Sequence, residues 1–481
     1  MTAPALTFST RPATGPRGLP LVGVLPQVRR DVLGFLTRTA AAHGDVARYR
    51  LGPLESFLVS HPDGVRHVLQ EHASNYSKDH MSYTMARWVA GNGLLTSQGS
   101  FWLRQRRLAS PAFHRGRVAA LGTDMVRATE AALHRWAPAA ARGEPVGVNK
   151  EMMQLTFRIM GEALFGADLA GHARGVGAAF DVLSEQVVTR FRSFRVLPPV
   201  LPFGTDRAFR TALATLDATV QHVITTRRSA PDDRGDLLSM FMLARDEDTG
   251  EVMNDRQLRD ELVTMMIAGH ETTATTLAWV WALLAAHGEA EARLHAELDG
   301  VLGGRAPTGA DLARLPWTRA VVDEAMRLFP PAYVFSRKTV DDDVIGGVRI
   351  PKGSAVDLSP WVTHRRADLW ERPDAFLPER FLGDEAVRRA RYAYFPFSGG
   401  PRQCIGLGFA LMEAQLIVAT VAQRYRLRPV TPGLPTPEPL ITLRPEGGLP
   451  MRLERRSAAN GHRASERELA QAESNGTPRR G

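Results

Sequence analysis

The chain has 481 residues, of which 44% are hydrophobic, and this composition is enough for a large buried core. Its net charge of +9 comes from 60 Lys and Arg against 51 Asp and Glu, but the arginines are spread along the chain, which argues against a nucleic-acid-binding protein. The one cysteine excludes an internal disulfide, and no run of about 20 apolar residues could form a membrane anchor. We therefore expect a cytoplasmic protein.

Helical periodicity dominates the sequence, and short strand-like runs flanked by Gly and Pro form a minor part. The predicted strands lie within residues 46–60, 332–357 and 438–454. The predicted helices span residues 116–142, 255–287, 288–302, 319–329 and 407–424. No repeat or linker divides the chain. Residues 21–455 are therefore expected to form one large, mainly α domain with a small β region, between a proline-rich segment (1–20) and a polar, poorly ordered tail (456–481).

The predicted helix 255–287 is apolar but carries Gly269, Glu271, Thr272 and Thr273 near its middle. Polar groups that are buried inside an apolar helix are costly and need a reason. One reason is structural, because threonine hydroxyls can hydrogen-bond to carbonyl groups four residues earlier. The other is a functional site at this point of the helix.

The single cysteine, Cys404, lies in a glycine-containing loop directly before the predicted helix 407–424. A helix N-terminus favours an anionic sulfur, and Arg402 adds a cation nearby. Gly400 and Gly406 would let the backbone approach a flat cofactor. A lone cysteine is usually a small buried hydrophobe, but the segment from Phe397 to Gly406 matches F-x-x-G-x-R-x-C-x-G at every fixed position. In this segment the chain resembles the cytochrome P450 family.

The resemblance implies a haem b cofactor with Cys404 as the thiolate ligand of the iron. It also makes the A-G-x-E-T-T pattern of residues 268–273 the oxygen-binding part of the helix, with Thr272 and Glu271 as catalytic residues and His270 as a bystander. The implied cofactor contacts are Trp102, Arg106, Ala268, Gly269, Arg337, Phe397, Gly400, Arg402, Cys404 and Gly406.

A pair of opposite charges, Glu324 and Arg327, lies one turn apart in the predicted helix 319–329. Alone, such a pair is usually a minor surface contact. The resemblance adds Arg380, from the segment Pro-Glu-Arg-Phe at 378–381, and implies a structural Glu-Arg-Arg cluster that holds the cofactor-binding core.

The stretches that the resemblance places around the substrate, including residues 180–200, are largely apolar and predict a lipophilic substrate. The candidate substrate contacts are Met81, Met85, Trp88, Ile267, Val334, Phe335 and Ile441. The positions that would anchor a fatty-acid carboxylate fall near Pro53 and Phe57, which cannot do so. A terpenoid or polyketide-like natural product is therefore preferred, and a fatty acid comes next.

The implied activity is a monooxygenase that activates O2 and inserts one oxygen atom into this substrate. Flavin and iron–sulfur motifs do not occur in the sequence, so we expect electrons from a separate ferredoxin and ferredoxin reductase, with the ferredoxin docked by surface charge. The basic residues expected at that surface are Arg104, Arg107, Arg388, Arg389 and Arg391. Two alternatives stay open: a P450-fold enzyme doing desaturation, coupling or isomerisation, and a haem sensor or electron carrier, against which Glu271 and Thr272 argue.

Overall fold

The computed structural model describes residues 12–166, 206–229 and 234–456, and isolated positions between 175 and 189. Most of the expected substrate stretch 180–200, the first 11 residues of the proline-rich segment and the tail from residue 457 onward lie outside the described residues. In the part that is described, the expected mainly α fold with small sheets is confirmed.

The α-helices are α1 (Leu25–Arg30), α2 (Val32–His43), α3 (Pro62–Arg66), α4 (Met81–Ala90), α5 (Gly99–Ala109), α6 (Arg115–Ala120), α7 (Gly122–Arg142), α8 (Val148–Phe165), α10 (Asp206–Ser229), α11 (Leu237–Leu243), α12 (Asp255–Ala286), α13 (Gly288–Leu302), α14 (Pro316–Leu328), α15 (Pro360–Thr363), α16 (Gly383–Arg388) and α17 (Leu407–Arg424). The shorter helical turns are η1 (His67–Glu71), η2 (Ala73–Asn75), η3 (Ser110–Phe113), η5 (Gly309–Arg314), η6 (Pro378–Phe381) and η7 (Gly400–Arg402). The strands are β1 (Val46–Leu51), β2 (Leu54–Val59), β3 (Tyr76–Ser77), β4 (Val146–Gly147), β5 (Phe335–Thr339), β6 (Asp343–Ile345), β7 (Val348–Ile350), β8 (Ala355–Leu358), β9 (Tyr425–Pro429), β10 (Pro437–Pro439), β11 (Leu443–Pro445) and β12 (Pro450–Arg455).

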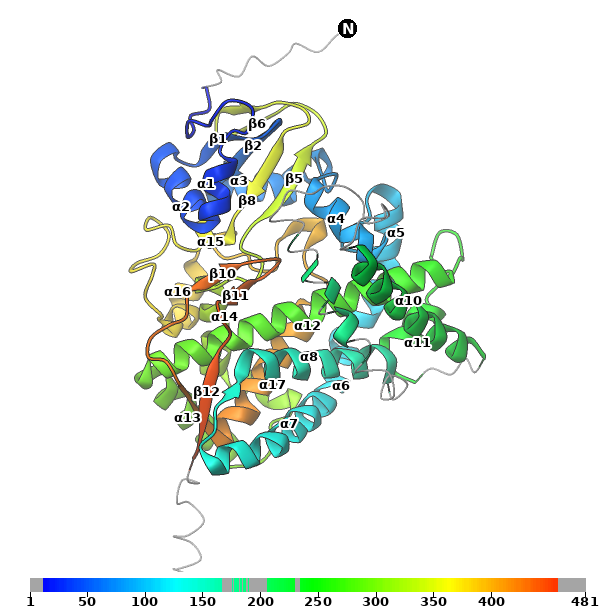
Figure 1. Cartoon of the computed structure of the whole chain (residues 1–481), viewed down its shortest axis with the longest axis vertical. Helices are drawn as coiled ribbons and strands as arrows, with labels where there is room; N and C mark the ends of the chain where they lie inside the picture. Colours follow the sequence, from blue (N-terminus) through cyan, green and yellow to red (C-terminus); the bar gives the residue numbers. More distant parts are fainter. Residues whose placement is uncertain are drawn as a thin grey trace, which may run out of the picture.

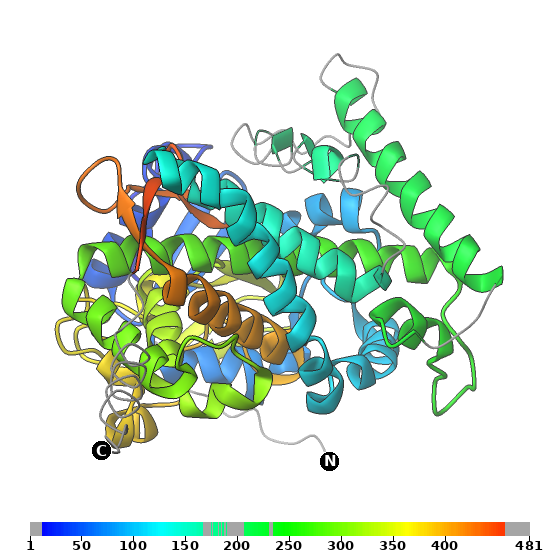
Figure 2. The ribbon, with the colours of Figure 1, turned by 90° about the horizontal axis from the view of Figure 1, so that it is seen from below.

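Helix α12 runs through the middle of the molecule, with α8 and α17 packed beside it and α7 packed against α8 and α17 (Figure 1, Figure 2). Its 32 residues extend over about 48 Å. A capping box formed by Asn254 and Gln257 starts the helix by satisfying free backbone N–H groups. Because nearly every face of α12 is buried, this helix forms the centre of the main hydrophobic core.

A five-stranded sheet occupies one end of the molecule (Figure 1), in the order β1-β2-β8-β5-β3. Strands β1 and β2 form a hairpin whose turn places Gly52 at φ +60°, a conformation that favours glycine. Strand β2 then pairs in parallel with β8, about 300 residues further along the chain, from Ser56 opposite Ala355 to Val59 opposite Leu358.

The central helix is fixed to its neighbours through Trp279. The indole ring stacks on Phe329 at 3.7 Å between ring centroids, and its N–H donates to the carbonyl of Leu443 at 2.7 Å. This contact joins α12 to the end of α14 and to β11. Among the described residues, no helix is both long and apolar enough to cross a membrane.

Candidate active site

A cavity of about 320 Å³ lies between α12, α5 and the loop that precedes α17. Its wall is mostly apolar, and no Asp or Glu is found in the described part of that wall. The lining includes Lys78, Tyr83, Trp102, Arg106, Phe113, Thr264, Ala268, Gly269, Thr272, Thr273, Ala332, Phe335, Arg337, Phe397, Arg402, Cys404 and Gly406. All of the expected cofactor contacts except Gly400 therefore lie on one cavity.

The cysteine loop is shaped by a tight backbone turn. The N–H of Cys404 donates to the carbonyl of Phe397 at 3.0 Å, and the N–H of Gln403 donates to the carbonyl of Gly400 at 3.1 Å. Gly400 has φ +64°, and a Cβ atom there would lie 1.7 Å from the carbonyl oxygen of Leu69. Glycine is required at residue 400 for this close approach, whereas a Cβ atom at Gly406 would meet only ordinary contacts.

The sulfur of Cys404 is exposed to the cavity but enclosed by the protein. Burial raises the pKa of the Cys404 thiol, and the N–H of Gly406 with the nearby Arg106 and Lys78 offsets only part of that rise. The N–H of Gly406 at the start of the helix thus favours the anionic sulfur, as expected, but burial has the larger effect in the opposite direction. A metal cation on the sulfur would supply the missing stabilisation, since coordination deprotonates a thiol.

Four cationic side chains converge on one edge of the cavity. Arg106 donates to the carbonyl of Gln403 at 2.9 Å, and Arg337 donates to the Tyr83 hydroxyl at 2.7 Å. Arg402 donates to the carbonyl of Ser97 at 2.9 Å, with its guanidinium 3.8 Å from the ring centre of Trp102. Lys78, which the sequence analysis missed, donates to the carbonyl of Leu95 at 2.8 Å.

These cations repel one another because no anion lies between them in the described cavity wall. Burial and the nearby Arg337 lower the pKa of Arg402 to about 10. Burial, with Arg337 and Arg402, also lowers the pKa of Lys78 well below its usual value. A ligand that brings carboxylates to this edge would relieve both effects.

The polar residues in the middle of α12 divide between two directions. Thr272 and Thr273 line the cavity, and their hydroxyls donate to the carbonyls of Ala268 (2.8 Å) and Gly269 (3.1 Å). The hydrogen bonds within the helix satisfy the threonine hydroxyls, which is the structural reason considered in the sequence analysis. The same hydroxyls still face the cavity. Glu271 is not part of the described cavity wall: it is 2% exposed and accepts hydrogen bonds from Thr442 (2.8 Å) and Arg444 (2.6 Å).

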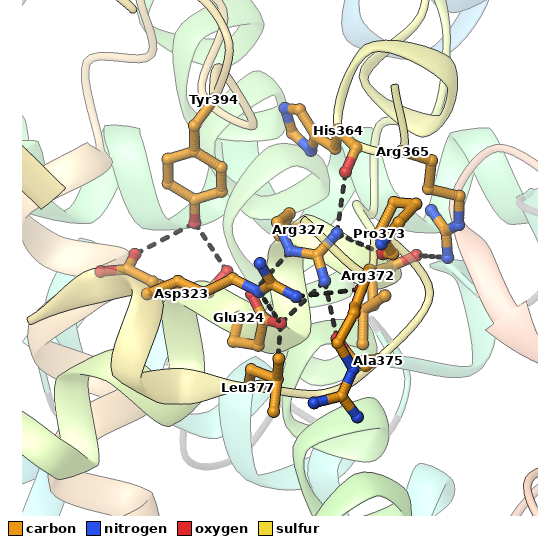
Figure 3. Close-up of polar contacts among 12 residues, drawn as sticks. Asp323, Glu324, Arg327, His364, Arg365, Arg372, Pro373, Ala375, Leu377 and Tyr394 are labelled. Atoms are coloured by element: carbon orange, nitrogen blue, oxygen red, sulfur yellow. Dashed lines mark hydrogen bonds and ion pairs between the residues drawn. The ribbon is translucent and has the colours of Figure 1, made fainter. Parts of the chain in front are cut away.

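The expected Glu-Arg-Arg cluster is buried around α14 (Figure 3), and its three residues do not belong to the described cavity wall. Arg327 donates two hydrogen bonds to the Glu324 carboxylate, at 2.6 and 2.7 Å, and both side chains are fully buried. Nε of Arg380 lies 3.5 Å from Glu324. The other donors of Arg327 go to the carbonyls of His364, Pro373 and Ala375, at 2.6–2.9 Å. One guanidinium thereby ties α14 to the segment 364–375.

The candidate substrate contacts are placed less uniformly. Phe335 lines the cavity, and Thr264 and Ala332 line it as well. Met85 is buried within the core, and Ile441 is 45% exposed. The remaining four, Met81, Trp88, Ile267 and Val334, are partly buried and do not belong to the described cavity wall. Their contact with a substrate stays a prediction.

The fold and this site define a haem-thiolate enzyme. The model of the cytochrome P450 family matches residues 13–450, so the chain belongs to this family and is a cytochrome P450 monooxygenase. It is 41% identical to cyclooctatin synthase of Streptomyces melanosporofaciens, over 90% of this chain and 94% of that protein. It is 35% identical to pentalenene oxygenase of Streptomyces avermitilis, over 86% of this chain and 91% of that protein.

Two further matches also support membership of the cytochrome P450 family. Cyclooctat-9-en-7-ol 5-monooxygenase of Streptomyces melanosporofaciens is 38% identical over 92% of this chain and 95% of that protein. The crystal structure of the cytochrome P450DA heme domain superposes with a TM-score of 0.84 at 26% identity, covering 93% of this chain and 99% of that one. Family membership implies a haem-thiolate cofactor, O2, a substrate and a source of electrons.

The cavity fits such a cofactor on its own chemistry. The one thiol of the chain opens into it, the walls are apolar, and four cations without a carboxylate partner in the described wall gather at one edge. A planar group with a metal at its centre and two carboxylates at its rim has a partner for each of these features.

Proposed function

We propose that this enzyme oxygenates a cyclic terpenoid, using haem b held by Cys404. The observation that carries the proposal is the similarity to three proteins whose names specify cyclooctatin, cyclooctat-9-en-7-ol and pentalenene chemistry, each over at least 86% of this chain. The apolar cavity wall formed by residues such as Phe335, Ala332 and Met265 supports it, because a hydrocarbon skeleton needs little polar recognition.

The haem, when bound, supplies the iron at which O2 is activated. In this proposal Cys404 is its sulfur ligand, and Arg106, Arg337, Arg402 and Lys78 bind its propionates through charge-assisted hydrogen bonds. Ala268 and Gly269 keep the facing side of α12 free of large side chains. A Cβ atom at Gly269 would lie 2.0 Å from Cε of Met160 on α8, which also lines the cavity, so α8 packs closely against α12 at this point. Thr272 presents a hydroxyl that can hold a proton in the cavity.

Glu271 is assigned as the group that passes protons from solvent toward Thr272, its neighbour on α12. Arg444, which holds its carboxylate at 2.6 Å, is 33% exposed, so the pair connects the buried helix to the surface beside β11. For Glu271 to serve the cavity, its carboxylate has to leave Arg444 and Thr442. The ion pair therefore holds Glu271 in a resting position.

Replacement of Glu271 by glutamine is expected to lower the rate of product formation by at least about 100-fold, because positioned proton transfer contributes that much. Glutamine keeps the size of the side chain and can still accept from Thr442, so the substrate-induced spectral shift should not change. The matched control is Glu446→Gln, which removes a carboxylate from an exposed position in the same region. Equal rates for the two variants would remove Glu271 from the mechanism.

A ferredoxin with its own reductase is the proposed electron source. Of the five arginines considered, Arg107, Arg388 and Arg391 are exposed, and Arg388 is paired with Asp384 at 3.2 Å. Arg104 is paired with Glu251 at 2.9 Å, and Arg107 with Asp248 at 2.7 Å. Arg389 packs on Phe381, 4.4 Å from the ring centre. The docking charge is thus smaller than the sequence suggested. Turnover with a flavoprotein reductase but not with a ferredoxin would contradict this partner.

The same proposal places the enzyme in the cytoplasm, where a lone thiol stays reduced.

The substrate class is tested by an absorbance titration of the haem-loaded protein. Cyclic terpenoid hydrocarbons and alcohols are expected to give a low-to-high-spin shift, because a ligand that fills the apolar cavity displaces water from the iron. Fatty acids of similar size serve as the comparison, since the described cavity places its cations at the cysteine edge and not near Phe57, which is buried. A shift with fatty acids alone would overturn the terpenoid assignment.

A further inference from the structure

Two histidines and an aspartate meet at the sheet end of the molecule, apart from the cavity. His67 begins η1, His72 follows its end, and Asp343 begins β6. One potential ligand atom from each of the three residues lies within 4.8 Å of the other two. Nε2 of His67 is 2.9 Å from the Asp343 carboxylate, and the two imidazole rings stack at 4.0 Å between centroids.

The backbone brings the two histidines together by an uncommon turn. Helix α3 continues into the π-helical turn η1, in which the N–H of His72 donates to the carbonyl of His67 at 2.9 Å, five residues earlier. Single π turns of this kind are rare in proteins, but those that occur often lie at functional sites. This turn stacks the two rings nearly parallel, with an interplanar angle of 15°, so the exposed His72 ring has to rotate out of the stack before both histidines can direct a lone pair at one ion.

Asp343 is oriented as a ligand by its own neighbours. The Tyr76 hydroxyl donates to its carboxylate at 2.7 Å and the Asn75 amide at 3.3 Å. Although burial acts in the opposite direction, hydrogen bonds from Tyr76 and His67 lower the pKa of Asp343. Burial together with Asp343 raises the pKa of Tyr76, so the tyrosine stays a donor. Hydrogen bonds of this kind fix and tune metal-binding carboxylates.

We propose that His67, His72 and Asp343 form a binding site for a divalent transition metal, with Zn²⁺ as the preferred ion. Two imidazoles and one carboxylate are a ligand set that zinc accepts, and the exposed position of His72 leaves room for water as the fourth ligand. If the cluster served only to form the hydrogen bond between His67 and Asp343, the imidazole of His72 would have no role in it. In the described contacts the His72 side chain donates and accepts no hydrogen bond, so its ring nitrogens are available.

The site borders the back of the cysteine loop. Leu69, within η1, has its carbonyl against Gly400, and Gln70 accepts a hydrogen bond from the Tyr392 hydroxyl at 2.9 Å. A metal that joins His67 to His72 would clamp the turn on which this loop rests. Zinc is therefore expected to raise the thermal midpoint of the haem-loaded protein, because an ion that binds only the folded state stabilises it.

The test uses haem-loaded protein that is stripped with a chelator, dialysed against ZnCl2 and analysed for zinc and iron by mass spectrometry. The wild type is expected to retain one zinc per iron. His72→Ala, at an exposed position, should lose this zinc and the thermal shift without loss of folding. Tyr76→Phe should bind about 10-fold more weakly through the unsupported Asp343. His134→Ala, at an exposed histidine of α7, is the control and should match the wild type.

The proposal is overturned if the wild type retains no more zinc than His72→Ala, or if His134→Ala loses as much as His72→Ala does. Iron content gives the amount of folded haem protein in each sample. A failure of terpenoid oxygenation would leave the zinc ratio untouched, so the two proposals are tested separately.

Discussion

Replacement of Glu324 by glutamine is expected to lower the free energy of unfolding by about 3–5 kcal/mol, the usual cost of removing one partner from a buried ion pair. Arg327 would keep its charge in a fully buried position, with only backbone carbonyls and a neutral amide as partners. The cost arises from this unpaired charge. The change is measured as a shift of the urea unfolding midpoint, followed by far-UV circular dichroism.

The matched control for Glu324 is Asp384→Asn. Asp384 also pairs with an arginine on its own helix, Arg388, at 3.2 Å, but both side chains are more than 75% exposed. Exposed pairs contribute about 0–1 kcal/mol, so its midpoint should barely move. Equal shifts for the two variants would show that the Glu-Arg-Arg cluster does not hold the fold in the way its burial indicates.

Replacement of Cys404 by serine is expected to abolish the thiolate-type spectrum of the reduced carbon monoxide complex and all oxygenation. The serine hydroxyl is nearly the same size, but it does not ionise near neutral pH and cannot donate electron density as the thiolate does. Circular dichroism should be unchanged, since the Cys404 side chain faces the cavity and not the core. The spectrum is recorded on dithionite-reduced protein.

Gln403→Ala is the control for Cys404, because Gln403 contributes its backbone carbonyl to Arg106 and its exposed side chain is dispensable for that contact. It should keep the thiolate-type spectrum. A serine variant that retained this spectrum would show that another group holds the iron.

Much of the helical architecture could be predicted from the sequence because residues close in the chain determine where each helix begins and ends. The predicted helices 288–302 and 407–424 match α13 and α17, and α13 ends where Gly303 adopts φ +58°. The helix expected from residue 319 begins at Pro316, since proline is favoured in the first turn. The predicted helix 116–142 is two helices, interrupted at Leu121. The parallel pairing of β2 with β8 depends on residues 299 positions apart and has no local pattern.

For the site as well, the features set by local sequence could be predicted and those set by distant partners could not. The cysteine loop and the cations next to recognisable motifs could be predicted, whereas Lys78 and Tyr83 reach the cavity from a segment without a motif. The outward direction of Glu271 depends on Arg444, 173 residues away, and the helix pattern contains no information on that partner. The raised pKa of Cys404 follows from burial, which local sequence does not fix.

The central claim is most directly tested by turnover of a cyclic terpenoid such as pentalenene or cyclooctat-9-en-7-ol under ¹⁸O2, with a ferredoxin, its reductase and a nicotinamide donor. A monooxygenase inserts one atom of O2 into its product, so the mass of the product should rise by that of one ¹⁸O atom. A product without the label, or no product from any terpenoid despite a bound haem and a normal spectrum, would contradict the account.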